Sequence, residues 1–278
     1  MTTENQFRYA LAYAVWRSLL RLHGRRGSEL EAYYFGVTRG YNDYDVVAPN
    51  YTGSHSKPDK LHSILPTVLK MIGDCEEKVV IDLGCGDGFF TLPFAERGAS
   101  LVVGADNSRA QIELGNRVSP HPKIWYRVGD VFLQHGGPAH IANAPFVANY
   151  ARTKAILRHF FALVYKTLHE GGKVAFVFDL PSGKSLQRFG AVKTLQGPRR
   201  DETPIEIKLF NGERHLCTLE ATYYTPSTIV ELLWEVGFKN VTWHQPIVSQ
   251  EGVEKFGAEF WDEYLKETEL GYLTAERI

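Results

Sequence analysis

Residues 78–106 read KVVIDLGCGDGFFTLPFAERGASLVVGAD, and this stretch decides the fold. It begins with an apolar, mostly β-branched run at 79–83, which is typical of a parallel strand with both faces buried. Glycines at 84, 86 and 88 follow, and they allow positive φ and a close approach of main-chain N–H groups to a ligand. A helix over 89–97 and a second strand over 101–105 complete the predicted βαβ unit.

An aspartate stands at the end of each strand of this unit. Asp82 stands near the end of the first strand, and Asp106 directly follows the second. Parallel pairing brings both to the same edge of the sheet, where an acid such as Asp106 can meet the paired hydroxyls of a ribose. We therefore expect one cofactor to contact both turns.

A nicotinamide dinucleotide is the main competitor, because it uses the same βαβ unit. Its fingerprint is Gly-x-Gly-x-x-Gly, whereas here the third glycine comes one residue early and both Asp82 and Asp87 lie in or beside the loop. Two carboxylates would repel a diphosphate but suit a ligand that carries an ammonium and a sulfonium group. A reductase that binds NAD(H) stays as a less favoured alternative.

The segment resembles motif I and its successor in the class I S-adenosylmethionine-dependent methyltransferases. The likeness continues in VGDV at 128–131, which resembles the end of the family's third strand. It continues again in LHEGGKVAFV at 168–177, which resembles the start of the fifth strand, with His-Glu at 169–170 where the family commonly has Lys-Pro. A narrower likeness, over about residues 41–278, is to the toxoflavin-synthase-like methyltransferases of small heterocyclic natural products.

This resemblance implies S-adenosyl-L-methionine as the cofactor. Asp106 would bind the ribose hydroxyls, Asn107 and Gln111 would flank the adenine, and Asp130 with Val131 would read the adenine edge. The glycine loop and the acid before it would hold the methionine portion. The full predicted cofactor-binding set is Tyr44, Tyr51, Asp82, Gly84, Cys85, Gly86, Asp106, Asn107, Gln111, Gly129, Asp130, Val131 and Asn149.

Methyl transfer requires little more of the protein than alignment of the acceptor and exclusion of water. An acceptor hydroxyl or acidic carbon must also lose a proton, which calls for a base near the methyl group. The predicted catalytic residues are Tyr51, Tyr150 and His244, with His140 and Tyr223 as further candidates for the base. Tyr150 and Asn149 follow the fourth strand, where they can face both the methionine end and the acceptor.

Alternating strands and helices predict an α/β fold with a doubly wound, mostly parallel, Rossmann-like sheet of seven strands. The remaining strands are expected at 124–128, 140–147, 173–179 and 239–248, and the family likeness implies a last, antiparallel strand at 271–278. Helices are expected at 56–72, 108–118, 153–168, 226–236 and 251–268.

Two segments lie outside this core pattern. An amphipathic helix at 5–23 and a tyrosine-rich stretch at 33–53 predict an N-terminal cap over residues 1–55, and the cofactor-binding domain is expected over 56–278. Alternating residues on both sides of Asn211-Gly212 predict a β-hairpin within an insertion at about 184–225, which we expect to form a lid.

Composition bears on which partners the protein binds: nucleic acid, a metal ion, a membrane or a second copy of the chain. The net charge of −1 offers no basic excess for nucleic acid, and three cysteines without a CxxC pair indicate neither a disulfide framework nor a metal site. There is no apolar run of membrane-spanning length, so a cytoplasmic protein is expected. The helix at 5–23, with Trp16 on its apolar face, offers a surface for a homodimer.

The sequence thus predicts an S-adenosylmethionine-dependent methyltransferase that acts on a small heterocyclic or aromatic metabolite at nitrogen. Two alternatives stay open. The first is O- or C-methylation of an anionic, for example phosphorylated, metabolite, because the chain also carries the basic residues Lys193, Arg199, Arg200, Lys208 and Arg214. The second is a scaffold subunit that binds the cofactor without turnover.

Overall fold

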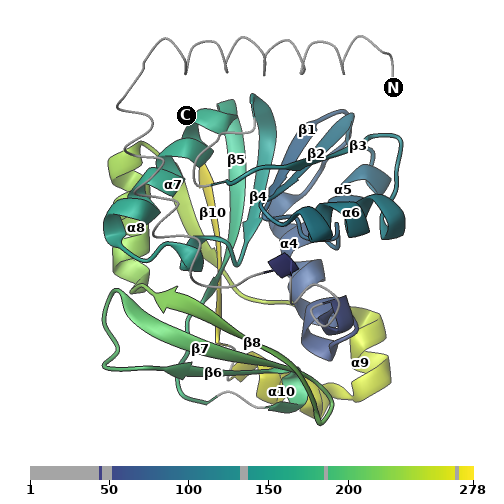
Figure 1. Cartoon of the computed structure of the whole chain (residues 1–278), viewed down its shortest axis with the longest axis vertical. Helices are drawn as coiled ribbons and strands as arrows, with labels where there is room; N and C mark the ends of the chain where they lie inside the picture. The colour runs from purple at the N-terminus through teal and green to yellow at the C-terminus, as the bar shows by residue number, and fades with distance from the viewer. Residues whose placement is uncertain (1–43, 46–51, 132–136, 185–186, 267–268) are drawn as a thin grey trace.

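The computed structural model describes residues 44–45, 52–131, 137–184, 187–266 and 269–278. Its main element is a seven-stranded sheet with the order β3-β2-β1-β4-β5-β10-β9 (Figure 1). Only β10 runs antiparallel to its neighbours, β5 and β9. The strands are β1 (Val79–Leu83), β2 (Leu101–Asp106), β3 (Ile124–Val128), β4 (Ala139–Pro145), β5 (Leu168–Asp179), β9 (Lys239–His244) and β10 (Leu270–Glu276). The predicted doubly wound α/β fold is confirmed.

Helices cover both faces of this sheet, and side-chain alternation along the strands explains why. In β1, Val80 faces a cluster that includes Val68 of α4 and Phe94 of α5, whereas Ile81 faces a cluster that includes Phe160 of α7. The helices are α4 (Leu65–Ile72), α5 (Thr91–Glu96), α6 (Arg109–Val118), α7 (Lys154–Thr167), α8 (Pro226–Val236), α9 (Gln250–Phe256) and α10 (Ala258–Lys266).

Two helix predictions need correction. The helix expected at 251–268 is divided into α9 and α10 at Gly257, which adopts a φ of 82°. The helix expected to be capped by Ser56 is instead capped by Asp59, whose carboxylate accepts the N–H of Lys60 at 2.7 Å. It opens with a π-helical turn, η2 (Lys60–Ile64), that runs directly into α4.

The predicted hairpin is present and has a third strand beside it. Strands β6 (Ala191–Leu195), β7 (Thr203–Asn211) and β8 (Arg214–Tyr223) form an antiparallel sheet in the order β6-β7-β8, which we call the lid sheet. It lies against one end of the main sheet (Figure 1). The sequence did not indicate β6, and the predicted strand at 239–248 is shorter than expected.

Short helical turns connect these elements at η1 (Thr52–Ser54), η3 (Ala148–Tyr150) and η4 (Gln187–Phe189). Tyr51 and the helix predicted at 5–23, with the dimer surface expected on it, lie outside the described residues.

Candidate active site

The glycine loop after β1 is built as the sequence predicts. Gly84, Gly86 and Gly88 have φ values of 69°, 54° and 90°, which side chains other than glycine rarely adopt. The N–H of Gly84 donates to the carbonyl of Ala105 at 2.8 Å, which ties the loop to the end of β2. A β-carbon at Gly84 would stand 2.4 Å from the side chain of Val147, so this turn needs glycine for space as well as for φ.

Asp106 connects three turns at the carboxyl edge of the sheet. Its carboxylate accepts the N–H of Gly86 at 2.8 Å and the N–H of Ser108 at 2.9 Å. Its carbonyl accepts the N–H of Gly129 at 2.8 Å. Burial raises the pKa of Asp106 to about 6, and the main-chain donors only partly offset that rise. The predicted ribose-binding acid is therefore held firmly beside the glycine loop.

Asp82 is fully buried on β1. Its carboxylate accepts the hydroxyl of Thr91 at 2.6 Å and the side-chain amide of Asn143 at 2.8 Å. Burial raises its pKa to about 7 despite these two donors. Thr91 and Asn143, which sequence reasoning did not single out, thus orient the first acid of the site.

Gln111 has polar atoms that nothing in the described part of the chain satisfies. It is 1% exposed, and both its amide oxygen and its amide nitrogen lack a hydrogen-bond partner among the described residues. A β-carbon placed on Gly86 would be 3.7 Å from the Gln111 oxygen, so this amide lies beside the glycine loop. A buried amide without partners costs about 1–3 kcal/mol, and a bound ligand with complementary polar atoms would remove that cost. The residues present therefore fit a nucleoside cofactor.

The segment before the glycine loop is docked onto the same edge. The carboxylate of Asp45 accepts the hydroxyl of Ser108 at 2.6 Å and the N–H of Ala110 at 3.0 Å, so it caps the start of α6. These bonds lower the pKa of Asp45. Tyr44 packs edge-on against Tyr150, and their hydroxyl groups are hydrogen-bonded to each other. Tyr44 and Tyr150 therefore meet near the end of β4.

The other predicted cofactor residues sit around this edge. Cys85 is buried within the glycine loop, and Val131 is buried after β3. Asp130 is half-buried beside it, and Asn107 is exposed between β2 and α6. The Cys85 thiol has a raised pKa because it is buried near Asp106, which makes it a packing residue and not a nucleophile.

Asn149 does not have the free amide that a cofactor contact needs. Its amide nitrogen donates to the carbonyls of Asp179 at 3.2 Å and Thr222 at 2.8 Å, and its oxygen accepts the N–H of Asp179 at 2.9 Å. Both N–H groups are thus used, and the residue is fully buried. Asn149 joins the lid sheet to the end of β5, and we withdraw it from the predicted cofactor set.

Neither predicted histidine is brought to the site. His244 lies on the edge strand β9, four strands from β1, and bonds to the hydroxyl of Thr274 at 2.7 Å. At roughly 4.8 Å per strand this separation is about 19 Å. His140 is the second residue of β4, at the opposite end of the sheet, where its Nδ1 accepts the N–H of Val79. The hydroxyl of Tyr223, the other base candidate, accepts a hydrogen bond from Arg199.

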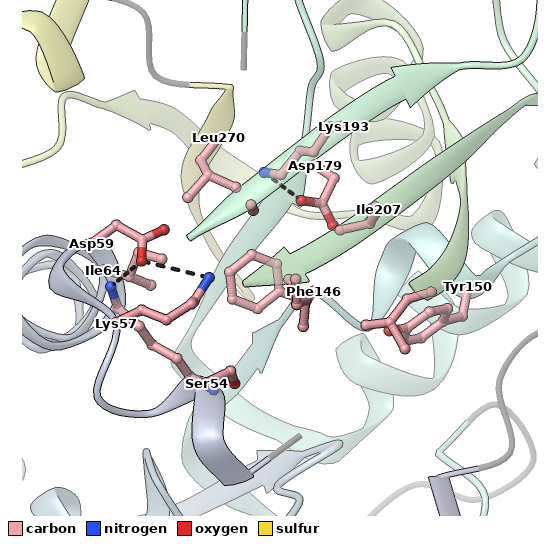
Figure 2. Close-up of a pocket in the computed structure, with 14 residues that line it drawn as sticks. Ser54, Lys57, Asp59, Ile64, Phe146, Tyr150, Asp179, Lys193, Ile207 and Leu270 are labelled. Atoms are coloured by element: carbon pink, nitrogen blue, oxygen red, sulfur yellow. Dashed lines mark hydrogen bonds and ion pairs between the residues drawn. The ribbon is translucent and has the colours of Figure 1, made fainter. Parts of the chain in front are cut away.

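A pocket of about 520 Å³, including the space open to solvent, lies between the main sheet and the lid sheet (Figure 2). Its apolar wall comes from β7 and β8, and Phe146 and Tyr150 border it from the end of β4. Phe146 has a φ of 65°, an unusual conformation for an aromatic residue and one that occurs mostly at functional sites. The lining residues are Ser54, Lys57, Asp59, Lys60, Ile64, Phe146, Tyr150, Asp179, Ala191, Lys193, Ile207, Leu209, Leu219 and Leu270.

Sequence reasoning missed most of these lining residues, and Lys57 and Lys60 above all. A Lys-Pro-Asp-Lys run before a helix gives no sign that its lysines will be buried. The sequence did single out Lys193, and it lines the pocket. By contrast, Arg199 is engaged with the carbonyl of Pro181, and the half-exposed Lys208 pairs with Glu206.

No group of three or more metal-ligating side chains occurs among the described residues. Within the same residues, no helix has the length and apolar character needed to cross a membrane.

Comparisons with known proteins give the class. A solved S-adenosylmethionine-dependent methyltransferase from Mesorhizobium loti is 19% identical, with a TM-score of 0.57 over 81% of this chain and 100% of its own. CalS10, an amino pentose methyltransferase from Micromonospora echinaspora solved with S-adenosylmethionine bound, is 17% identical, with a TM-score of 0.53 over 84% of this chain and 97% of its own. The fold is therefore that of the class I S-adenosylmethionine-dependent methyltransferases.

The family model for the methyltransferase small domain matches residues 44–197, more than half of the chain. The chain belongs to this family. A Haemophilus influenzae protein described as uncharacterized is 35% identical over 73 residues, which is 26% of this chain and 29% of that protein. The match thus spans less than a third of that relative's length. The narrower likeness to toxoflavin-synthase-like enzymes stays a prediction.

Proposed function

We propose that this protein transfers a methyl group from S-adenosylmethionine to a small, ring-containing acceptor bound beneath the lid sheet. The observation that carries the proposal is the pairing of two sites at one sheet edge. The glycine loop with Asp82 and Asp106 lies at the ends of β1 and β2, and the pocket bordered by Phe146 and Tyr150 begins at the end of the neighbouring β4. When bound, the cofactor supplies a methyl group on a positively charged sulfur.

The residues of the glycine loop have distinct roles in this proposal. Asp106, held by two main-chain donors, accepts hydrogen bonds from ribose hydroxyls. The side-chain amide of Gln111 can both donate a hydrogen bond to the adenine and accept one from it. The carboxylate of Asp130 is predicted to bind the edge of the same adenine. Asp82 supplies negative charge near the methionine ammonium.

The pocket residues orient the acceptor. Apolar side chains of the lid sheet, such as Ile207 and Leu219, cover a flat ring and exclude water. Burial raises the pKa of the Tyr150 hydroxyl, so this group stays protonated near neutral pH. Tyr150, whose hydroxyl is already hydrogen-bonded to that of Tyr44, therefore offers the acceptor a neutral hydroxyl and is not a base. An acceptor nitrogen with its own lone pair needs no base, and this favours N-methylation.

The experiment is a turnover assay with S-adenosylmethionine and a library of heterocyclic and aromatic metabolites, with S-adenosylhomocysteine as the measured product. Acceptor-dependent product that disappears in Asp106→Ala supports the proposal. Tight binding of S-adenosylhomocysteine without turnover on any acceptor would instead support a scaffold subunit, and binding of NADH alone would support a reductase.

A further inference from the structure

Ser54 is a buried polar residue in the wall of the pocket beneath the lid sheet. It ends the short turn η1 and is 1% exposed. Its carbonyl accepts the N–H of Lys57 at 3.3 Å, but no group in the described part of the chain forms a hydrogen bond with its hydroxyl. A buried polar group without a partner is rare in folded proteins because it is costly, and a bound ligand would remove the cost.

The backbone on either side of Ser54 is tied to the lid sheet. The carbonyl of Gly53 accepts the side-chain amide of Asn211, the last residue of β7, at 3.5 Å. Lys57 donates to the carbonyl of Gly190 at 3.2 Å, and a β-carbon on Gly190 would be only 2.4 Å from Cδ of Lys57. These contacts limit the positions that the Ser54 hydroxyl can reach, so the group is held at the pocket wall before a ligand arrives.

The other polar groups considered at this wall have partners. The Tyr150 hydroxyl is bonded to that of Tyr44, and the ammonium of Lys193 pairs with the carboxylate of Asp179 at 2.7 Å. Figure 2 shows Ser54 and Tyr150 on separate parts of the lining. Among the described residues that line the pocket, Ser54 is the one with a buried side-chain polar atom that lacks a hydrogen bond. Its hydroxyl therefore marks the point where a ligand needs a polar atom.

The chemistry of a hydroxyl indicates which polar atom this is. A serine hydroxyl has one O–H donor and two lone pairs, and buried donors without a partner are rarer than acceptors with an unused lone pair. The O–H is thus the side that most needs a partner, so the ligand must bring a hydrogen-bond acceptor. The apolar side chains of Ile207 and Leu219 border the same space and suit the body of a ring.

We propose that Ser54 determines specificity for the methyl acceptor by donating a hydrogen bond to a neutral atom of its ring system, either a carbonyl oxygen or an unprotonated ring nitrogen. The inference rests on the proposed function and names the class of ring that the pocket takes. A ring without such an atom would leave the buried hydroxyl unpaired and closed off from water, so the pocket would bind it less tightly.

Adenine has ring nitrogens too, so the cofactor is a second source of the same chemistry. We assign Ser54 to the methyl acceptor because no residue of the glycine loop at 84–88 lines the pocket. The experiment therefore measures the cofactor and the acceptor separately.

The first test is the melting temperature of the ligand-free full chain. Ser54→Ala should melt no more than about 1 °C below wild type, because its hydroxyl has no bond to lose. Ser249→Ala is the contrasting variant, since that hydroxyl accepts the N–H of Gly252 at 3.1 Å and bonds to the ring of His62 at 3.1 Å. It should melt about 2–4 °C below wild type. An equal fall in Ser54→Ala would show that Ser54 has a structural partner, and the proposal would be wrong.

The second test is isothermal titration calorimetry, first with S-adenosylhomocysteine and then, at saturation with it, with matched ring compounds. The pairs are oxindole and indoline, 4-chromanone and chromane, and quinoline and naphthalene, in which only the first member has the carbonyl oxygen or the ring nitrogen. At least one first member should bind roughly tenfold more tightly than its partner. In Ser54→Ala the difference should fall to about twofold or less. Ser56→Ala, which removes an exposed hydroxyl of the same segment, is the matched control and should keep it.

Three results of the calorimetry would overturn the proposal. The first is the absence of a preference in every pair, and the second is a preference that Ser54→Ala keeps. The third is a loss of roughly tenfold in the affinity of Ser54→Ala for S-adenosylhomocysteine, because Ser54 would then serve the cofactor. Failure of the wild-type protein to bind S-adenosylhomocysteine would instead count against the proposed function.

Discussion

The main-chain N–H of Gly86 donates to the carboxylate of Asp106 at 2.8 Å. This bond holds the glycine loop of β1 against the acid at the end of β2, twenty residues further along the chain. Because the second carboxylate oxygen of Asp106 accepts the N–H of Ser108, the acid is fixed in one orientation before a ligand arrives. Fixed polar groups bind with less loss of conformational freedom, which is what a preorganised cofactor site requires.

The space at Gly84 is too tight for even a methyl group. Gly84→Ala should lower the free energy of unfolding by about 3–5 kcal/mol, because it combines an unfavourable φ with a contact of 2.4 Å to Val147. Gly212→Ala is the matched control, since Gly212 has a φ of 61° but nothing within 4 Å of a β-carbon, and it should cost about 1–2 kcal/mol. Urea unfolding of both variants measures the difference. Equal losses would mean that the packing against Val147 is not as described.

Asn149 should act on stability and not on cofactor affinity. Asn149→Ala removes the hydrogen bonds of the buried Asn149 amide to the N–H of Asp179 and to the carbonyl of Thr222, and we expect a loss of about 2–3 kcal/mol in urea unfolding. The affinity of the folded variant for S-adenosylhomocysteine should be unchanged. Asn116→Ala removes an exposed asparagine that also donates to a main-chain carbonyl, and it should cost less than about 0.5 kcal/mol. If Asn149→Ala instead bound S-adenosylhomocysteine more weakly while its free energy of unfolding stayed unchanged, the original prediction of Asn149 as a cofactor-binding residue would be right.

Affinity for S-adenosylhomocysteine should rise with pH between about 5 and 8. The pKa of Asp106 is about 6 and that of Asp82 about 7, both above the usual value near 3.8. Ribose hydroxyls and an ammonium group favour the ionised acids, so binding lowers these pKa values and releases protons in this range. Calorimetry across pH measures both effects. In Asp106→Asn, the change of S-adenosylhomocysteine affinity with pH near pH 6 should disappear. Affinity that is flat with pH would show that neither acid contacts the ligand.

The same two acids oppose folding once they ionise. Because their folded pKa values are raised, their contribution to stability is complete below about pH 4 and is lost as the pH rises through about 6 to 7. The ligand-free protein should therefore lose thermal stability over this range relative to Asp106→Asn. Saturation with S-adenosylhomocysteine should reduce that loss, as measured by the melting temperature.

His244 should be dispensable for chemistry. It is four strands from β1, and its side chain bonds to Thr274 within the β9–β10 pair. His244→Ala should cost about 1 kcal/mol of stability and leave kcat and cofactor affinity within about twofold of wild type. A loss of roughly a hundredfold in kcat, in a variant that unfolds normally, would contradict this placement.

The sequence predicted those parts of the molecule that depend on local pattern. The β1 loop, the strand at 124–128 and the antiparallel last strand all follow from apolar runs, glycine spacing or family likeness, and the structure reproduces them. Side-chain environments depend on contacts between distant residues, and there the predictions were weaker. The Asn149 amide is used by Asp179 and Thr222, which are 30 and 73 residues away along the chain.

The pocket shows the same limit. Lys57 and Lys60 read as an ordinary exposed charge run at the start of a helix. Lys57 is buried against Gly190, which lies just before β6 and accepts a hydrogen bond from Lys57 across 133 residues, and β6 had no clear signal in the sequence. Lys60 lies over the ring of Phe89, 29 residues further along the chain. No local rule connects these segments, so only the assembled fold reveals the charged lining of the pocket.

The most direct measurement of the central claim is calorimetric titration of wild type and Asp106→Ala with S-adenosylmethionine, S-adenosylhomocysteine and NADH. We predict micromolar binding of the two sulfur ligands to wild type, no binding of NADH, and a loss of roughly tenfold or more in Asp106→Ala. Binding of NADH in their place, or sulfur-ligand affinity that is unchanged in the variant, would contradict the assignment of the glycine loop and Asp106 as the cofactor site.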